Sequence, residues 1–423
     1  MQLTPHQERA KATLIEALAS GAPEVSLSGP AGSGKTTMAK QTLADLVDRV
    51  HDVAIVAPTN KAAKVLNDKG LFATTIHSQF FIADKQPGKK LKFYSAAEYV
   101  RRGLALPEGK RDFAEIIAID EASMLNSWVL GELRKMCNQL ILIGDQHQLP
   151  PVNDLIMPAG YFNTRRHTAE LSEILRQSEG SPILDLATAI RTGAPFEALM
   201  RQFFPIEAFS DVAAELPQFI AFTNKERARV NRLVRARHGL YGALPEEGEK
   251  VICASNYDDL LLNGTEATVA SFEWNGTSRR ASILLDVGRG DRVERREASI
   301  CMLAFLNDLQ NSQRAEYNDL MTDWERQLKN NPTAASFAEE DLVLRFGYCI
   351  TAHAAQGSEY QDVVVIDQTS KLEWAGKQNG SKGMSADEFV RRWMYTAVTR
   401  ARQNLIIAPE WWAANVSVGR AAA

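Results

Sequence analysis

Cysteines are few in this sequence, and their spacing excludes two kinds of site. The 423 residues contain four of them, Cys137, Cys253, Cys301 and Cys349. No two have the CxxC spacing that is typical of a zinc ligand pair. Disulfide frameworks belong to short secreted domains with many cysteines. We therefore expect neither a disulfide framework nor a zinc centre, and we expect the protein in a reducing cytoplasm.

Long apolar runs and an excess of positive charge are also lacking. No apolar stretch approaches the roughly 20 residues that a membrane span needs. The N-terminal segment MQLTPHQERAKATLIEAL has no apolar core of the kind found in signal peptides. The 48 basic and 52 acidic residues give a net charge of −4, which excludes a uniformly basic surface. A nucleic-acid-binding surface would have to be a local groove, and no membrane partner is expected.

The sequence does contain short apolar runs that alternate with helical patterns, in two series. The first series has strand-like runs at 24–29, 53–58, 115–120 and 139–145, with a clear helical pattern after Lys35. The second series has such runs at 219–224, 347–352, 362–367 and 404–409. This order predicts an α/β fold with two parallel sheets. Ligands of such sheets bind beyond the carboxyl ends of the strands.

Two segments interrupt this alternation. Residues 78–111 are rich in lysine and arginine, and residues 246–345 combine short β-like runs and glycine turns with a helical stretch near 305–330. We interpret both segments as insertions. The expected first domain consists of 1–77 and 112–152, and the expected second domain consists of 153–245 and 346–423.

The segment GPAGSGKTT at 29–37 matches the phosphate-binding pattern G-x-x-x-x-G-K-[ST]. Glycines let the backbone fold closely around phosphates, and the loop amides and the following helix N-terminus carry partial positive charge. Lys35 would reach the β- and γ-phosphates of ATP, and Thr36 would bind Mg²⁺. A plain glycine-rich turn is the alternative, which the flanking strand and helix disfavour. The candidate nucleotide ligands are Gly29, Pro30, Ala31, Gly32, Ser33, Gly34, Lys35, Thr36 and Thr37.

Two acidic residues end the apolar strand of IIAIDEAS at 116–123. Asp120 is a candidate Mg²⁺ ligand, because a P-loop site needs a carboxylate from a second strand to hold its metal. Glu121 would orient the attacking water or accept its proton. The alternative is an ordinary strand end with a solvated acidic pair.

Eight short blocks occur in one order along the chain. They are GPAGSGKTT (29–37), APTNKAA (57–63), TTIH (74–77), IDEAS (119–123), LIGDQHQLPPV (142–152), LSEILRQ (171–177), ITAHAAQGSEYQDVVVI (350–366) and MYTAVTRARQNLII (394–407). Together they resemble the motif series of superfamily 1 DNA helicases of the RecD/Dda branch, most of all the compact phage Dda-type enzymes. The resemblance implies two RecA-like P-loop motor domains. It further implies a β-hairpin pin at 78–111 and an SH3-like β-barrel with a helical tower at 246–345.

The resemblance also implies further nucleotide contacts. One glutamine would read the adenine edge, and a second would sense the γ-phosphate. Two arginines from the second motor domain would approach that phosphate, and a glycine of the AQGSE block would face both nucleotide and DNA. Taken alone, the first glutamine and both arginines are better explained as ordinary surface residues. The adenine-reading glutamine is Gln7 and the γ-phosphate sensor is Gln148. The two arginines are Arg176 and Arg400, and the glycine is Gly357.

A set of DNA contacts follows from the same resemblance. Hydroxyl, amide and imidazole groups suit phosphate oxygens without restricting the protein to one position. Either histidine of the set would, taken alone, be a structural residue. Phe93 or Tyr94 could lie at the tip of the pin and stack on the first base pair, with a surface β-ribbon as the alternative. The implied contacts are Pro58, Thr59, Asn60, Thr75, His77, Phe93, Thr351 and His353.

One helical segment carries five arginines. At helical spacing they do not share one face, so we interpret the segment as a solvated helix rather than a track for DNA. The arginines are Arg227, Arg229, Arg232, Arg235 and Arg237.

The expected function is an ATP-dependent DNA helicase that moves 5′→3′ on single-stranded DNA, with ATP and Mg²⁺ as cofactors. Single-stranded DNA and single-strand/duplex junctions are the expected partners, in a bacterial or phage-infected host cytoplasm. Single-stranded-DNA-binding protein and replication proteins are candidate protein partners. The chain lacks the N-terminal domain of larger RecD-type proteins, which favours a stand-alone monomer. The alternatives are another DNA-stimulated P-loop motor and a non-catalytic helicase-like module that binds DNA or a partner.

Overall fold

The structure is a computed structural model that describes most of the chain. The described residues are 3–47, 52–84, 92–151, 154, 156–173, 181–204, 216–258, 260–275, 280–289, 292–302, 305, 341–379 and 383–409. Arg176 and nearly all of the expected tower lie outside them. The chain packs into two units, of which the first is Met1–Phe196 with Ser370–Thr399 and the second is Glu197–Thr369 with Arg400–Ala423. Among the described residues, no helix is both long enough and apolar enough to cross a membrane.

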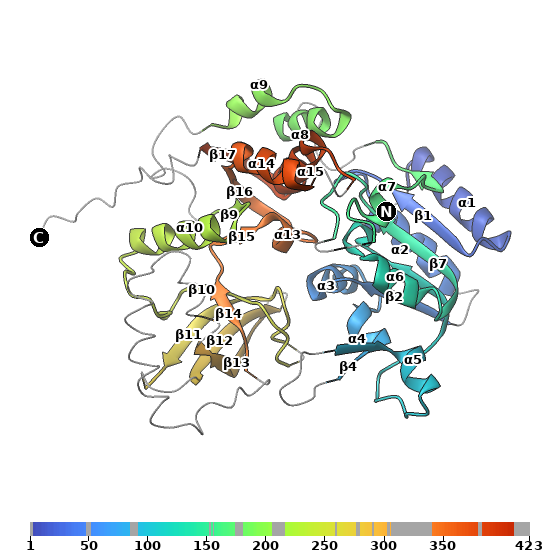
Figure 1. Ribbon diagram of the computed structural model, residues 1–423, viewed down its shortest axis with the longest axis horizontal. Helices are drawn as coiled ribbons and strands as arrows, with labels where there is room; N and C mark the ends of the chain where they lie inside the picture. The colour runs from blue at the N-terminus through green and yellow to red at the C-terminus, as the bar shows by residue number, and fades with distance from the viewer. Residues whose placement is uncertain are drawn as a thin grey trace, which may run out of the picture. The chain divides into compact units, whose positions relative to one another are not determined.

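A six-stranded parallel sheet forms the centre of the first unit (Figure 1). Its strand order is β3-β2-β6-β7-β1-β8, and each neighbouring pair is parallel. The four strands expected in this part of the chain are all present. The six strands are β1 Glu24–Ser28, β2 Val53–Ala57, β3 Ala73–Thr75, β6 Ala114–Ile119, β7 Cys137–Gly144 and β8 Ala169–Glu170.

Helices cover both faces of this sheet. Successive side chains of β6 point to opposite faces, so Ile116 packs in one apolar cluster with α1, α2 and α3, and Ile117 packs in another with α4 and α6. Burial on both faces explains the nearly continuous apolar runs of the central strands. The helices of this unit are α1 Pro5–Ala19, α2 Lys35–Val47, α3 Asn60–Asp68, α4 Ile76–Phe80, α5 Ala96–Arg101, η1 Ala122–Met124, α6 Ser127–Leu133, α7 Tyr161–Thr164, α8 Pro182–Thr192, α14 Thr369–Asn379 and α15 Ala386–Val398.

The 78–111 segment contains a two-stranded antiparallel hairpin of β4 (Phe81–Asp84) and β5 (Lys92–Ser95). Phe93 pairs with Ala83 across this hairpin. The expectation that Phe93 or Tyr94 lies at the hairpin tip is therefore wrong, because both residues lie within β5 itself. The connection between the two strands precedes Lys92 and lies outside the described residues.

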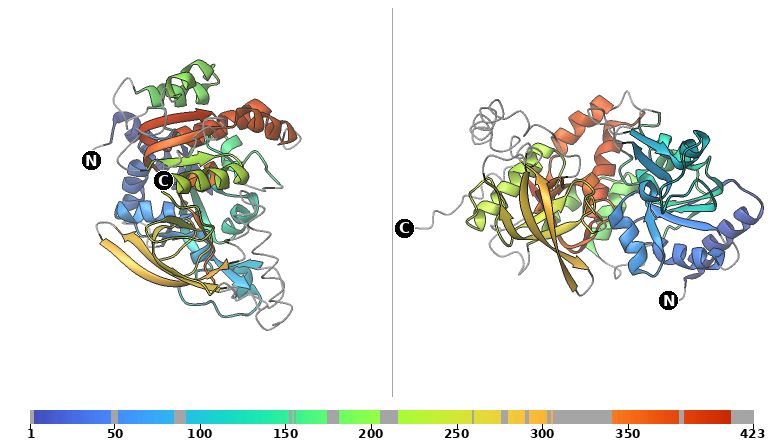
Figure 2. Two further views of the ribbon diagram at one scale, coloured as in Figure 1. Left: turned by 90° about the vertical axis from the view of Figure 1, so that its left-hand side faces the viewer. Right: turned by 90° about the horizontal axis from the view of Figure 1, so that it is seen from below.

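The second unit contains a parallel and an antiparallel sheet. The parallel sheet has the order β15-β9-β16-β17, and the antiparallel sheet has the order β13-β12-β11-β10-β14. Figure 2 shows the long ribbon of β12 and β13 in gold. The strands are β9 Gln218–Ala221, β10 Lys250–Cys253, β11 Glu266–Glu273, β12 Arg280–Arg289, β13 Arg292–Cys301, β14 Leu344–Phe346, β15 Cys349–Thr351, β16 Tyr360–Asp367 and β17 Ala401–Pro409. The helices are α9 Glu197–Met200, η2 Arg201–Phe203, α10 Asn224–Arg237 and α13 Ala352–Ala355.

Helix α10 carries the five arginines, and two of them are buried. Arg227 is 4% exposed and Arg235 is 2% exposed. Arg235 Nε donates to Glu249 Oε1 at 2.7 Å, and its guanidinium lies 4.1 Å from the centre of the Phe346 ring. The interpretation of a solvated helix is therefore wrong for these two arginines. The carboxylate that pairs with Arg235 comes from another segment, so the spacing along the helix could not show it.

Candidate nucleotide site and nucleic-acid surface

The P-loop connects β1 to α2 at the carboxyl edge of the first sheet. Gly32 and Gly34 have φ angles of 82° and 78°, left-handed values that glycine adopts without strain. A Cβ on Gly29 would lie 2.7 Å from Ser33 Oγ and 3.0 Å from Leu171 Cβ. The loop is therefore too tight at Gly29, and too strained at the other two positions, for larger residues.

Lys35 begins α2 and folds back onto its own loop. Its Nζ donates to Gly29 O at 2.6 Å and to Pro30 O at 2.9 Å. These two hydrogen bonds hold the Lys35 ammonium group close to the P-loop, within reach of a ligand bound by the loop. Thr36 follows Lys35 in the first turn of the helix and is half-buried.

Gln7 lies against the P-loop from helix α1. Its side chain is 4% exposed, and its Nε2 donates to Ser33 O at 3.1 Å. Its Oε1 accepts from the Thr4 N–H at 3.0 Å and closes the capping box of α1. Gln7 therefore connects helix α1 to the P-loop. This structural role is additional to the adenine contact that the resemblance implies for it.

Asp120 and Glu121 follow β6 at the same edge of the sheet. Burial raises the pKa of Asp120, while the hydrogen bond from the Glu121 N–H and the charge of Lys35 oppose the rise. The Glu121 N–H donates to Asp120 Oδ1 at 3.0 Å. Glu121 has φ 55°, the only positive φ of a non-glycine residue in the described chain. Such a conformation costs about 1–3 kcal/mol and is typical of functional sites.

The donor set fits Mg²⁺ held partly by a nucleotide. In the described parts of the chain, no group of three or more His, Cys, Asp or Glu side chains could hold a metal ion. Mg²⁺ is commonly bound through one or two protein ligands together with substrate phosphates and water. Thr36 and Asp120 offer such a small set of ligands.

The LIGDQHQLPPV segment continues from β7 into a buried loop. Asp145 is fully buried, and its carboxylate accepts from the Tyr395 hydroxyl at 2.8 Å and from the His147 N–H at 3.0 Å. Gln148 is 3% exposed, and its Oε1 has no hydrogen-bond partner among the described residues. Ser33 Oγ in the P-loop is likewise buried without such a partner. Two unsatisfied polar atoms beside the glycine loop fit a site for a polar ligand.

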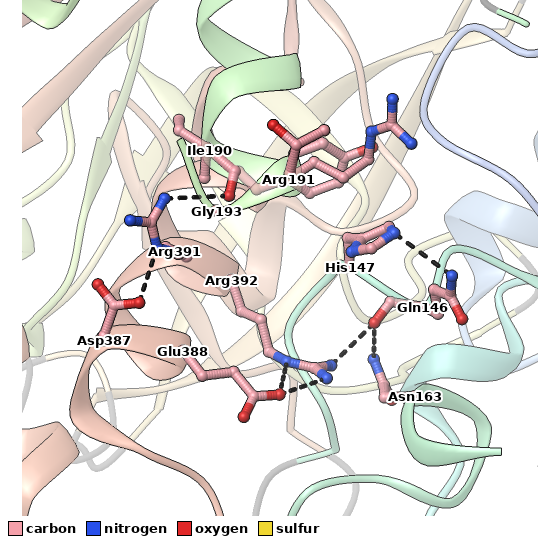
Figure 3. Close-up of a pocket in the computed structure, with 12 residues that line it drawn as sticks. Gln146, His147, Asn163, Ile190, Arg191, Gly193, Asp387, Glu388, Arg391 and Arg392 are labelled. Carbon is pink, nitrogen blue, oxygen red and sulfur yellow. Dashed lines mark hydrogen bonds and ion pairs between the residues drawn. The ribbon is translucent and has the colours of Figure 1, made fainter. Parts of the chain in front are cut away.

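Helix α15 holds this loop in place. Arg392 Nη1 donates to Gln146 O at 2.9 Å, and Thr396 Oγ1 accepts from the Leu149 N–H at 3.0 Å. Figure 3 shows Arg392 reaching Gln146 beside a cavity of about 470 Å³. Asn163 donates to the same Gln146 carbonyl at 3.1 Å. The loop is therefore fixed from two sides by side chains distant in sequence.

Tyr395, which the sequence analysis did not single out, connects this helix to the P-loop. Its hydroxyl accepts from the Ala31 N–H at 3.1 Å and donates to Asp145 Oδ2. The tyrosine lies in the MYTAVTRAR block, in which the resemblance implied a role only for Arg400. A buried tyrosine hydroxyl normally has a polar partner, but the partner's identity depends on the fold.

The second unit brings together two other blocks of the series. Arg400 is 4% exposed, and its Nη1 donates to Ser358 O at 3.0 Å. Gly357 precedes Ser358 with φ 74°, and Gln356 is buried beside it. Arg400 thus holds the AQGSE turn of its own unit.

A family model described as "AAA domain" matches residues 2–202. Two curated relatives are 26% identical to the chain. The "ATP-dependent DNA helicase dda" of Enterobacteria phage T4 matches 56% of this chain and 57% of its own length. The "ATP-dependent RecD2 DNA helicase" of Deinococcus radiodurans matches 94% of this chain and 48% of its own length. A third relative, an uncharacterised mimivirus protein, is 31% identical over 36% of this chain and 34% of its own length.

Solved structures show the same fold. The Pif1 helicase of Candida albicans covers 96% of this chain and 94% of its own at 18% identity, with a TM-score of 0.55. A Bacteroides Pif1 structure in complex with ADP-AlF3 and single-stranded DNA gives a TM-score of 0.55 at 15% identity, covering 96% of this chain and 92% of its own. The chain is thus similar in sequence to helicases named Dda and RecD2 and similar in fold to Pif1 helicases. It spans about half the length of the curated relatives that it matches.

The three threonines that the sequence resemblance assigns to DNA contacts have one structural position in common. Each is the N-cap of a helix that follows a parallel strand. Thr59 accepts from the Ala62 N–H at 3.2 Å, and Thr75 accepts from the Ser78 N–H at 3.1 Å. Thr351 is the corresponding cap of α13 in the second unit. Helix capping therefore accounts for these residues locally, while their place at the carboxyl edge of each sheet suits a ligand contact.

The two histidines of the helicase motifs have lowered pKa values. Partial desolvation, with a smaller contribution from the Lys110 ammonium, lowers the pKa of His77, although this residue is exposed at the surface. Burial lowers the pKa of His353 to about 4. Both imidazoles are therefore neutral at pH 7, so they could contact DNA by hydrogen bonds or stacking but not by charge.

An aromatic cluster joins the hairpin to helices α4 and α6. The His77 ring lies 5.3 Å from that of Phe93 and 5.2 Å from that of Phe81, and Phe81 lies 5.4 Å from Trp128 on α6. Phe93 and Trp128 are 39% and 45% exposed. Trp128 had no signal in the sequence, because the cluster forms only when β4 and α6 pack together.

Proposed function

We propose that this chain is an ATP-dependent DNA helicase that moves 5′→3′ on single-stranded DNA and separates the strands of a duplex. The observation that carries the proposal is that Lys35, Asp120 and the loop of Asp145 meet at the carboxyl edge of one parallel sheet. That edge is where α/β sheets bind ligands. The proposed direction rests on the resemblance to the RecD/Dda branch.

In this proposal, ATP binds with its phosphates in the P-loop. The loop amides and Lys35 hold the β- and γ-phosphates, and Gln7 lies on the adenine side. Thr36 and Asp120 would hold Mg²⁺, which would supply positive charge to the phosphates. Asp120 has to lose its proton for this, which the neighbouring Lys35 charge favours.

Hydrolysis is assigned to residues on both units. Glu121 orients the attacking water and takes its proton, and Gln148 senses the γ-phosphate. Arg176 and Arg400 stabilise the negative charge of the transition state, and Gly357 faces the nucleotide. Arg400 belongs to the second unit, whereas position 176 falls within the range of the first. Binding and release of phosphate would then move the two motor domains and advance the DNA.

Single-stranded DNA is proposed to cross the carboxyl edges of both parallel sheets. The contacts are Pro58, Thr59, Asn60, Thr75, His77, Thr351 and His353. Bases stack on aromatic platforms in sequence-independent binding, and the cluster of Phe93, His77 and Trp128 supplies such a platform. The β4–β5 hairpin is proposed to be the strand-separating pin, and the antiparallel sheet of the second unit the SH3-like barrel. We propose that the helicase acts as a monomer.

ATP hydrolysis with and without oligo-dT tests this function. We expect a rate that depends strongly on DNA. Lys35→Ala should abolish hydrolysis and keep most DNA affinity. Glu121→Gln should bind ATP and hydrolyse it roughly 10²- to 10⁴-fold more slowly, which is the contribution of a general base. A rate independent of DNA would favour another P-loop enzyme, and no hydrolysis by the wild type would favour a non-catalytic module.

A further inference from the structure

The Tyr395 hydroxyl joins two parts of the first unit to which the proposed function assigns the nucleotide. It accepts a hydrogen bond from the Ala31 N–H of the P-loop at 3.1 Å and donates one to Asp145 Oδ2 at 2.8 Å. The side chain is 2% exposed, and burial raises its pKa well above the ordinary value. The hydroxyl therefore keeps its proton and acts as donor to the carboxylate at every physiological pH.

Two of the groups of the P-loop that could bind phosphate already have protein partners in this arrangement. Backbone N–H groups of such a loop are the groups that cradle phosphate oxygens. The Ala31 N–H is instead paired with Tyr395, and Lys35 Nζ is paired with the carbonyl oxygens of Gly29 and Pro30. A nucleoside triphosphate whose γ-phosphate reached this part of the loop would have to compete for both.

Asp145 depends on the same hydroxyl. It is fully buried, and a buried carboxylate is costly unless its oxygens accept hydrogen bonds. Among the described residues, Tyr395 donates to Oδ2 and the His147 N–H donates to Oδ1. Since the Gln148 N–H donates to Asp145 O at 3.2 Å, a shift of Asp145 would move Gln148 as well.

We propose that Tyr395 is a positioning residue that responds to the γ-phosphate. When a nucleoside triphosphate binds, the Ala31 N–H donates to the γ-phosphate and no longer to the Tyr395 hydroxyl. The hydroxyl then keeps only its hydrogen bond to Asp145. A nucleoside diphosphate, which lacks the γ-phosphate, leaves the bridge intact. The presence or absence of the γ-phosphate thereby changes the hydrogen bonding of Asp145 and the position of the loop that contains Gln148. This inference rests on the proposed ATP site.

Tyr395→Phe is the direct test, because phenylalanine keeps the buried ring and removes only the hydroxyl. The affinities to compare are those of the non-hydrolysable analogue AMP-PNP and of ADP, each with Mg²⁺. Removing the competitor should tighten AMP-PNP binding about 2- to 10-fold, the range that corresponds to one net hydrogen bond. ADP binding should stay within 2-fold. Equal changes for both nucleotides, or no change for either, would overturn the proposal.

Tyr161→Phe is the matched control. The Tyr161 hydroxyl also donates to a carboxylate at 2.8 Å, but this is Glu24, at the opposite end of β1 from the P-loop. Its removal should leave the ratio of the two affinities unchanged. If wild-type protein binds neither nucleotide, the ATP site itself is refuted. If the wild type binds both and hydrolyses ATP but the ratio does not change in Tyr395→Phe, only the inference fails.

Hydrogen exchange on the wild-type protein tests the same proposal without any substitution. With AMP-PNP and Mg²⁺, amide exchange in the segment 145–149 should differ from exchange with ADP and Mg²⁺. The β7 residues before this segment serve as the internal reference, and their exchange should be the same with both nucleotides. Equal exchange of 145–149 in the two states would contradict a role for Tyr395 in reporting the γ-phosphate.

Discussion

The Glu121 backbone N–H donates a 3.0 Å hydrogen bond to the carboxylate of Asp120, and Glu121 itself adopts φ 55°. Along a regular strand, neighbouring side chains point to opposite faces. The left-handed turn at Glu121 ends that alternation directly after β6. The two adjacent carboxylates therefore need not point to opposite faces of the sheet, which is compatible with the separate roles proposed for them.

The strain at Glu121 can be measured apart from its chemistry. Glu121→Ala and Glu121→Gly both remove the carboxylate, but only glycine adopts the left-handed conformation without strain. We expect the glycine variant to be more stable than the alanine variant by about 1 kcal/mol, as measured by denaturant unfolding. Equal stability of the two variants would show that the backbone at Glu121 is not strained in solution.

Arg400→Ala should reduce DNA-stimulated ATP turnover about 10³-fold or more, the scale of an arginine finger. The substitution also removes the hydrogen bond to Ser358 O within the second unit. A loss of turnover could therefore reflect a disturbed fold, and a control for nucleotide binding is needed. ADP affinity is the control, because the P-loop belongs to the other unit. A turnover within tenfold of wild type, with ADP binding intact, would remove Arg400 from the transition state.

Trp128→Ala should weaken oligo-dT binding about fivefold or more, since one base stacked on an aromatic ring contributes about 1–3 kcal/mol. Phe93→Ala should act in the same direction, because both rings contact the same cluster around His77 and Phe81. Trp374→Ala is the matched control, a tryptophan that is 66% exposed on α14. An equal loss in all three variants would mean that the cluster is not a specific platform.

Acid should destabilise the first unit through His167. Burial, together with the charge of Arg165, lowers the pKa of His167 to about 4 from 6.5. The unfolded chain binds a proton below pH 6.5 and the folded one does not. The stability contributed by the neutral ring is therefore complete above pH 6.5 and is lost as the pH falls toward 4. At pH 5 the loss is about 2 kcal/mol.

The measurement for His167 is thermal unfolding at pH 7.5 and pH 5. His167→Asn keeps a polar group near Ser26 Oγ, which lies 3.2 Å from His167 Nδ1, and should show a smaller loss than wild type between the two pH values. His238→Asn, at an exposed position, should keep the full wild-type loss. The same acid loss in all three proteins would contradict the assignment.

The parallel strands, the P-loop and the carboxylate pair could all be predicted from local sequence. Their signals are apolar runs, glycine spacing and the residue after a strand, which depend on neighbours in the chain. The hydrogen bond between Tyr395 and Ala31 joins residues 364 positions apart in the sequence. Arg235 likewise pairs with Glu249, which lies outside its own helix. Trp128 joins the aromatic cluster only through tertiary packing. No local pattern contains that information, so these contacts required the structure.

The position of Phe93 shows the same limit in a smaller element. Its aromatic and basic surroundings suggested a hairpin tip, but the pairing of Phe93 with Ala83 puts it inside β5. The register of a hairpin depends on where its turn lies, and the expectation for Phe93 did not use the Pro87-Gly88 turn signal between the strands to set that register. The side chain consequently faces His77 and not the end of the hairpin.

Unwinding of matched duplexes with either a 5′ or a 3′ single-stranded tail tests the central claim most directly. With ATP and Mg²⁺, we predict that the wild-type protein separates the 5′-tailed duplex and leaves the 3′-tailed duplex intact, and that Lys35→Ala separates neither. Separation of the 3′-tailed duplex instead, or of neither duplex by wild-type protein, would contradict a 5′→3′ helicase.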